Sequence, residues 1–205
     1  MLSVATQILR GYSYNQVKTV CEALVESKIR SVEVTLNTDD ALTMISRLSE
    51  EFGEKLFIGA GTVITLNDAK EAIQAGAKFI LSPILMTNEM IDYCKEHDVI
   101  TVSGALTPTE IYEAFSRGSD IVKVFPVKEF SFNYAYSVCE PLGDLPLMAV
   151  GGVNHTNVNQ YLKNGFKYVG TAGGIFRKED ILNCNLENLI ESRKVFESKL
   201  NVNSN

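Results

Sequence analysis

Short apolar strands and amphipathic helices alternate regularly along this chain of 205 residues. The predicted strands cover residues 4–9, 31–36, 56–60, 79–81, 99–102, 120–125, 147–150 and 168–171, and helical patterns separate them. Such alternation produces parallel strands joined by crossover helices, and eight such units close into a barrel. We therefore predict an α/β fold, a (β/α)8 TIM barrel in a single domain of residues 1–205, with residues 201–205 as a frayed tail.

Polar residues mark where several of the predicted helices begin. Ser13 with Gln16, and Thr107 with Glu110, have the spacing of a capping box. Thr-Asp-Asp at residues 38–40 opens the helix after the second strand, with its acids at the positive end of the helix dipole. Further helices are predicted over residues 65–75, from residue 87, and over residues 131–139, 155–164 and 186–200.

The main alternative fold is a doubly wound open sheet. Its phosphate-binding fingerprint, Gly-x-Gly-x-x-Gly, does not follow the first predicted strand. Gly-Ala-Gly at residues 59–61 follows the third strand, but it is too short a match to indicate that fold. The glycine pattern therefore favours the barrel.

The composition excludes several classes of partner. A formal net charge of −6 and a pI near 5.0 argue against nucleic acid or an anionic membrane. No apolar run approaches the roughly 20 residues of a membrane span, and the first residues lack the features of a signal peptide.

The spacing of the cysteines and histidines bears on compartment and metal binding. The four cysteines are widely spaced, which predicts free thiols in the cytoplasm. The two histidines lack ligand spacing, so we expect no metal.

A lysine lies inside the sixth predicted strand, and this is the strongest chemical signal in the chain. Strand side chains alternate, so Ile121, Lys123 and Phe125 share one face of the strand. Burial among apolar neighbours disfavours the charged ammonium, and a neutral amine is the form that attacks a carbonyl. The alternative is a strand lysine that extends to solvent or forms a salt bridge.

A glutamate occupies a similar position in the second predicted strand. Glu33 shares the polar face of residues 31–36 with Ser31 and Thr35. Lys123 and Glu33 together indicate a catalytic amine with its general acid/base. A buried ion pair, in which the two charges only neutralise each other, is the alternative.

The remaining candidate residues follow the C-terminal ends of the predicted strands, where barrels place their active sites. Paired glycines after the seventh and eighth strands are typical of a phosphate site built from backbone N–H groups, although turns also need glycine. Arg10 is expected to bind a phosphate or carboxylate, or to form a salt bridge at the rim. Thr62 is expected to bind a carboxylate or to cap a helix. These candidates are Arg10, Thr62, Ser82, Pro83, Gly151, Gly152, Gly173 and Gly174.

Several short motifs recur in the order and spacing of one known family. They are Glu-Val-Thr-Leu (33–36), Gly-Ala-Gly-Thr-Val (59–63), Ser-Pro (82–83), Lys-Val-Phe-Pro (123–126) and Gly-Gly (151–152). From the first strand to the eighth, the chain resembles the 2-keto-3-deoxy-6-phosphogluconate / 4-hydroxy-2-oxoglutarate (KDPG/KHG) aldolases. That resemblance implies a homotrimeric barrel without metal or cofactor, which binds pyruvate and 2-keto acids in carbohydrate metabolism of the Entner–Doudoroff type.

The resemblance also assigns roles to three residues. It implies that Lys123 forms the Schiff base, that Glu33 is the general acid/base, and that Thr62 binds the substrate carboxylate. The expected reaction is class I aldol cleavage of a 2-keto-3-deoxy-6-phospho sugar acid of the phosphogluconate type, or of 4-hydroxy-2-oxoglutarate, to pyruvate and an aldehyde. The aldehyde would be glyceraldehyde 3-phosphate or glyoxylate.

The departures from the family pattern leave the substrate open. Asn37 stands where the phosphogluconate enzymes usually have arginine, and Ile-Leu-Arg-Gly (8–11) supplies Arg10 instead. This arrangement resembles the 2-keto-3-deoxy-6-phosphogalactonate branch, which is the alternative substrate. Gly173 lies near the position of the family's phosphate-binding serine, so either Thr171 and backbone N–H groups compensate or the substrate has a different tail.

Two functions of other classes also fit the sequence. One is a phosphate-sugar isomerase or epimerase on a similar barrel, in which Lys123 only pairs with substrate charge. The other is a non-catalytic ligand-binding barrel. Covalent trapping with borohydride separates an imine-forming aldolase from both.

Overall fold

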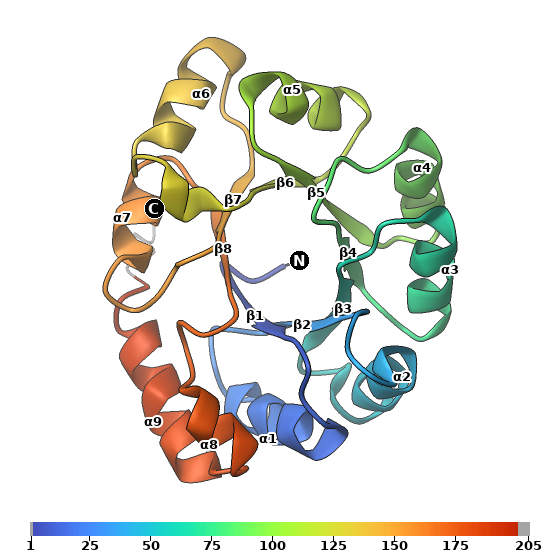
Figure 1. The fold of residues 1–205 in the computed structure, drawn as a ribbon, viewed down its shortest axis with the longest axis vertical. Helices are drawn as coiled ribbons and strands as arrows, with labels where there is room; N and C mark the ends of the chain where they lie inside the picture. Colours follow the sequence, from blue (N-terminus) through green and yellow to red (C-terminus); the bar gives the residue numbers. More distant parts are fainter. Residues whose placement is uncertain (1, 201–205) are drawn as a thin grey trace.

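Eight parallel strands form a closed barrel in chain order, with β8 pairing back to β1. This computed structural model describes residues 2–200, and Figure 1 shows the helices around the ring of strands. The strands are β1 (Ala5–Leu9), β2 (Ser31–Thr35), β3 (Phe57–Gly61), β4 (Phe79–Leu81), β5 (Ile100–Ala105), β6 (Ile121–Val124), β7 (Leu147–Val150) and β8 (Tyr168–Thr171). The predicted (β/α)8 fold is confirmed, and the open-sheet alternative is wrong.

Helices follow the strands on the outside of the barrel. They are α1 (Tyr14–Leu24), α2 (Ala41–Phe52), α3 (Leu66–Gln74), α4 (Asn88–Glu96), α5 (Pro108–Ser116), the 3-10 turn η1 (Val127–Glu129), α6 (Tyr134–Leu142), α7 (Val158–Lys163), α8 (Lys178–Leu182) and α9 (Leu186–Glu197). Among residues 2–200, no helix is long and apolar enough to cross a membrane. The single domain of residues 1–205 stays a prediction, and the predicted tail at 201–205 lies outside the described residues.

Alternation along the strands divides the apolar side chains between two cores. On β6, Val122 and Val124 face outward and pack in the layer between strands and helices. Ile121 belongs to the smaller core inside the barrel. That inner core consists of Leu2, Ile8, Phe79, Leu81, Val102, Ile121, Met148 and Val150. The predicted division of the lysine strand into two faces is therefore confirmed for its apolar residues.

Some helix boundaries differ from the predicted ones because side chains satisfy the backbone before the helix begins. The helix predicted to open with residues 38–40 begins at Ala41, and Asp40 adopts a left-handed φ of 55°. The Thr38 hydroxyl instead accepts a hydrogen bond from the Gly11 N–H at 2.9 Å. Likewise α7 begins at Val158, because Asn157 Oδ1 accepts the Asn154 N–H at 2.8 Å.

Other differences concern β5, α6 and the C-terminal helices. The strand predicted to end before Ser103 continues to Ala105, since Gly104 pairs with Lys123 of β6. The helix predicted over residues 131–139 is α6, which is shifted to Tyr134–Leu142. The short helix α8 was not predicted, because five residues are too few to show helical periodicity.

Glycine on β3 makes room for the largest side chain of the inner core. A Cβ on Gly59 would lie 2.4 Å from the ring of Phe79, which has no exposed surface. The ring therefore occupies the volume that a side chain at residue 59 would fill, within the inner core of the barrel.

We predict that Gly59→Ala lowers the free energy of unfolding by about 1–3 kcal/mol, the usual cost of overpacking a core. Urea denaturation measures the change. Gly173→Ala is the matched control, because a Cβ there meets no atom within 4 Å. Equal stability of Gly59→Ala and Gly173→Ala would contradict this account of the core.

Candidate active site

Lys123 is held inside the barrel at the C-terminal end of β6. Its side chain is 6% exposed, and its Nζ lies 5.2 Å from the centre of the Phe125 ring. Burial lowers the pKa of Lys123, and the positive charge of Arg10 lowers it further, while Glu33 acts in the opposite direction. The result is an amine that loses its proton more readily than an exposed lysine, as a nucleophile requires.

Glu33 lies on the inner face of β2 and is 2% exposed. Burial raises its pKa to about 7, although Lys123 and Arg10 both act to lower it. Gly61 provides the space for the carboxylate, because a Cβ on that residue would lie 1.7 Å from Glu33 Oε1. A carboxyl group with a pKa near neutrality can both accept and donate a proton.

The two buried groups influence each other without direct contact. No ion pair within 4.0 Å joins their side chains, both of which belong to the described part of the chain. Glu33 Oε2 is buried and has no hydrogen-bond partner. A buried ion pair would use both charges directly, so that alternative does not describe this site. An unpaired carboxylate oxygen beside a buried amine is instead suited to receive a ligand.

A cavity of about 380 Å³ opens at the C-terminal end of the barrel, and both groups line it. Its lining comes from residues on or just after β1, β2, β3, β4, β6, β7 and β8. Of the predicted site residues, it contains Arg10, Glu33, Thr62, Pro83, Lys123, Gly151, Gly152, Gly173 and Gly174. The fold thus brings nine of the ten predicted residues to one cavity.

Thr62 has an unusual backbone conformation for its residue type. It follows β3 directly and has a φ of 59°, in the left-handed region that β-branched residues seldom occupy. Thr62 is half-buried and lines the cavity rather than capping α3, because Thr65 is the N-cap of that helix. The helix-capping alternative for Thr62 is therefore wrong.

Ser82 is the one predicted residue that does not reach the cavity. It is fully buried just beyond β4, and its hydroxyl accepts a hydrogen bond from the Ile84 N–H at 3.3 Å. That bond holds the turn that places Pro83 in the lining. Thr171 lines the cavity, but its hydroxyl is occupied: it donates to the Val153 carbonyl at 2.6 Å and accepts the Gly174 N–H at 2.8 Å.

The loop after β7 has a backbone that only glycine adopts readily. Gly151 and Gly152 have φ values of 102° and 84°. Side-chain amides fix the shape of this loop, since Asn154 and Asn157 both donate to the Gly152 carbonyl, at 3.3 and 2.9 Å. The glycine pair therefore belongs to a rigid turn at the edge of the cavity.

Two lining residues that can bind a ligand, Phe125 and Asn154, were not predicted from the sequence. Phe125 lies just beyond β6 and is 45% exposed, with its ring beside the Lys123 amine. The sequence could have indicated Phe125, because it shares a strand face with Lys123. Asn154 also lines the cavity, and nothing in its local sequence distinguished it from a turn residue.

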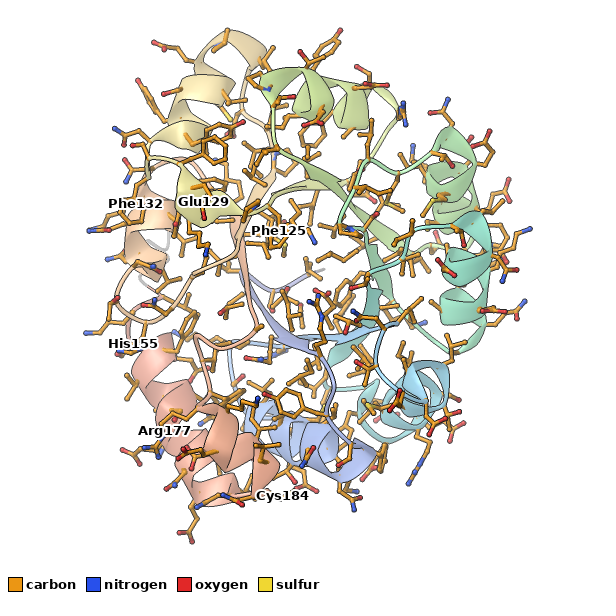
Figure 2. The ribbon with its side chains drawn as sticks, viewed as in Figure 1. Phe125, Glu129, Phe132, His155, Arg177 and Cys184 are labelled. Atoms are coloured by element: carbon orange, nitrogen blue, oxygen red, sulfur yellow. The ribbon has the colours of Figure 1, made fainter. Side chains whose placement is uncertain are left out.

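His155 lies outside this cavity. Figure 2 shows His155 and Arg177 at the outer side of the ring of strands, whereas Phe125 lies close to the barrel opening. His155 and Arg177 line a separate groove of about 220 Å³ on the far side of Gly173 and Gly174. Within residues 2–200, no three His, Cys, Asp or Glu side chains form a cluster that could hold a metal ion.

Comparison with known proteins identifies the family. A family model described as "KDPG and KHG aldolase" matches residues 5–191. The chain belongs to the KDPG and KHG aldolase family. The resemblance seen in the motifs is therefore confirmed, and so is the aldolase class of enzyme at the level of the family.

Relatives of both branches occur among the similar proteins. The 2-dehydro-3-deoxy-6-phosphogalactonate aldolase of Escherichia coli is 27% identical over 171 residues, which cover 83% of each chain. The 2-dehydro-3-deoxy-phosphogluconate aldolase of Pseudomonas aeruginosa is 33% identical over 144 residues, 70% of this chain and 64% of that one. A KDPG aldolase of Legionella pneumophila, solved with pyruvate as a covalent carbinolamine, has a TM-score of 0.84 and 26% identity, and the alignment covers 94% of each chain.

We predict that Glu33→Gln in this aldolase becomes more stable than the wild type as the pH rises. The folded wild type keeps its Glu33 proton up to a pKa of about 7, while the unfolded chain loses it near 4.5. Wild-type stability therefore falls between pH 4.5 and 7, by roughly 3 kcal/mol at most given about 1.4 kcal/mol per pH unit. Glutamine does not titrate, so the difference in melting temperature should grow over this interval and stay constant above it.

The matched control is Glu191→Gln, which removes an exposed carboxylate from α9. It should show no such pH-dependent difference from the wild type. A stability difference for Glu33→Gln that is the same at pH 5 and pH 8 would contradict the raised pKa.

Proposed function

We propose that this chain is a class I aldolase that cleaves a 2-keto-3-deoxy-6-phospho sugar acid of the phosphogluconate type to pyruvate and glyceraldehyde 3-phosphate. It would also, or instead, cleave 4-hydroxy-2-oxoglutarate to pyruvate and glyoxylate. The observation that carries the proposal is the placement of Lys123 and Glu33, unpaired and buried, in one cavity at the C-terminal end of the barrel.

Lys123 begins the reaction by attacking the C2 ketone through its neutral Nζ. Glu33, in its acid form, protonates the oxygen of the resulting carbinolamine, water leaves, and an iminium ion forms. The Glu33 carboxylate then takes the proton of the C4 hydroxyl, directly or through water. The C3–C4 bond breaks, its electron pair moves toward the iminium nitrogen, and an aldehyde and an enamine result.

The same glutamic acid completes the cycle. Glu33 returns its proton to C3 of the enamine, and water hydrolyses the pyruvyl iminium to pyruvate and the free amine of Lys123. The pKa of about 7 suits this double role, because acid and base forms are then both present near neutral pH.

The other lining residues bind the two ends of the substrate. Thr62 is proposed to hold the carboxylate, which the left-handed conformation of its backbone supports. Backbone N–H groups of the loops with Gly151, Gly152, Gly173 and Gly174, together with the Arg10 guanidinium, are proposed to hold the phosphate. The Gly174 N–H is bound to Thr171, so in this proposal Gly174 shapes the loop rather than donating to the phosphate.

A second candidate substrate is 2-keto-3-deoxy-6-phosphogalactonate, which differs in configuration at C4. One observation favours it: Arg10 lines the cavity, whereas Asn37, at the usual arginine position of the phosphogluconate type, does not. Both sugar acids give the same two products, so pyruvate release must be measured separately with each pure epimer. A higher kcat/KM for one of them assigns the branch.

We predict that borohydride traps pyruvate on the peptide containing Lys123, as peptide mass spectrometry would show. Lys123→Met should abolish both the adduct and turnover, while Lys78→Met, which changes an exposed lysine at the start of β4, should retain both. Glu33→Gln should slow turnover by about 10²- to 10⁴-fold and still form the adduct. Turnover by Lys123→Met at the wild-type rate, or no adduct in the wild type, would favour the isomerase or the non-catalytic barrel.

We also propose that the protein works in the cytoplasm as a homotrimer. Four free cysteines, two of them buried, suit a reducing compartment. The segment after β6 exposes four aromatic side chains, Phe125, Phe130, Phe132 and Tyr136, with exposed fractions from 37% to 62%. Such a run of exposed apolar surface is typical of a contact between copies of a chain; Figure 2 labels Phe132 on its outer side.

Light scattering should give three times the 22.6 kDa mass of one chain. Phe130→Ser with Phe132→Ser should shift the mass toward that of the monomer. Leu182→Ser is the matched control, since Leu182 is 46% exposed on α8, which lies at the opposite end of the view from α6 in Figure 1. If the double variant is still a trimer, this surface is not the interface between copies.

A further inference from the structure

Gln7 is a fully buried polar residue that the reaction scheme does not use. It lies on β1 between two residues of the inner barrel face, Thr6 and Ile8, so its side chain points to the outside of the barrel wall. Its Nε2 donates to the Ile8 carbonyl at 2.9 Å and to the Ala172 carbonyl at 3.0 Å. Its Oε1 is buried without a partner.

The position of these two bonds is significant because the β1–β8 ladder ends there. Gln7 and Thr171 are the last residues paired in register. The Val169 N–H donates to the Val4 carbonyl, and the bonds of a parallel ladder advance by two residues on each strand. A continued ladder would therefore direct the Gly173 N–H to the Ile8 carbonyl.

In place of the Gly173 N–H, the side-chain Nε2 of Gln7 donates to the Ile8 carbonyl. Among the described residues, the Gly173 N–H has no hydrogen-bond partner, whereas the next N–H, of Gly174, binds the Thr171 hydroxyl. Gly173 lines the active-site cavity. The side chain of Gln7 thus ends the ladder early and holds the following loop at Ala172.

We propose that Gln7 is a positioning residue that keeps the Gly173 N–H available for the phosphate of the substrate. This inference rests on the proposed aldolase function and deepens it. It explains how the loop after β8, which has no side chain free to bind phosphate, presents a backbone N–H group instead. Gln7 does not touch the substrate. It acts through Ala172, while the Thr171 bonds to Val153 and Gly174 hold the other side of the same loop.

Because Gln7 Oε1 has no partner, the stability and the phosphate recognition of a Gln7 variant should change independently. Gln7→Met removes this buried oxygen without a partner, which raises stability, but it also removes the donor to the Ile8 and Ala172 carbonyls, which lowers stability. Because these two effects oppose each other, Gln7→Met should change the melting temperature little and yet impair phosphate recognition. A merely structural glutamine would lose stability and activity together.

The experiment measures the condensation of pyruvate with two aldehydes, glyceraldehyde 3-phosphate and unphosphorylated glyceraldehyde. In Gln7→Met, the kcat/KM for the phosphorylated aldehyde should fall about 10- to 100-fold, as expected for one hydrogen bond to a charged group. The kcat/KM for glyceraldehyde and the borohydride trapping of pyruvate on Lys123 should stay at their wild-type levels.

Gln16→Met is the matched control. It also removes a bond between a glutamine Nε2 and a carbonyl of the C-terminal segment, that of Leu182 at 3.2 Å, but on the exposed surface. Its preference for the phosphorylated aldehyde should equal that of the wild type. An unchanged preference in Gln7→Met, or an equal loss with both aldehydes, would overturn the proposal.

A measurement on the wild type tests the same point if Gln7→Met does not fold. In NMR spectra, the Gly173 amide should exchange rapidly with solvent and shift when inorganic phosphate is added. A Gly173 amide that is protected without phosphate and unaffected by it would overturn the proposal. Failure of pyruvate trapping in the wild type would instead refute the aldolase function, and the phosphate titration would still decide the role of Gln7.

Discussion

The site depends on the burial of two opposite charges that are kept apart. Lys123 and Glu33 lie on the inner faces of β6 and β2, and each is nearly inaccessible to solvent. Removal from water opposes the charged form of both groups, which lowers the pKa of the lysine and raises that of the glutamate. A direct ion pair would reverse much of this effect, so their separation keeps the pKa of Lys123 lowered and that of Glu33 raised, as the proposed reaction needs.

The barrel meets this requirement through side-chain volume. Gly61 leaves room for the Glu33 carboxylate and Gly59 leaves room for the Phe79 ring, so the interior is filled below the ionisable groups and open above them. The stability lost by burying a carboxyl group is offset by the large outer core between strands and helices. The barrel can therefore bury two ionisable groups and remain folded.

The loops after β7 and β8, which we propose to bind the phosphate, depend on hydrogen bonds to the backbone. The loops after β7 and β8 carry few charged side chains, and their shape is set by bonds from Gln7, Thr171, Asn154 and Asn157 to backbone groups. Backbone N–H groups bind an anion well only when they are already oriented toward it. In the proposed function these four residues therefore bear on phosphate binding, and two of them, Gln7 and Asn157, lie outside the cavity lining.

The sequence by itself indicated the fold through local patterns and the class of reaction through its resemblance to a family. Alternating strands and helices indicate parallel strands, and eight such units favour a closed barrel over an open sheet. A lysine and a glutamate inside apolar strands are recognisable from their neighbours. The family motifs fixed the reaction class. Helix starts near residues 40 and 157 were displaced, since bonds made by Thr38 and Asn157 side chains cannot be read from periodicity.

Only the tertiary structure decided which groups are free to act. It removed the Thr171 hydroxyl and the Ser82 side chain from the candidate ligands, added Phe125 to the cavity wall, and joined Gln7 to a loop 165 residues away. A hydrogen-bonding group can serve a ligand only if no closer partner takes it. Whether a closer partner exists depends on which segments the closed barrel brings together, and local sequence patterns do not show this.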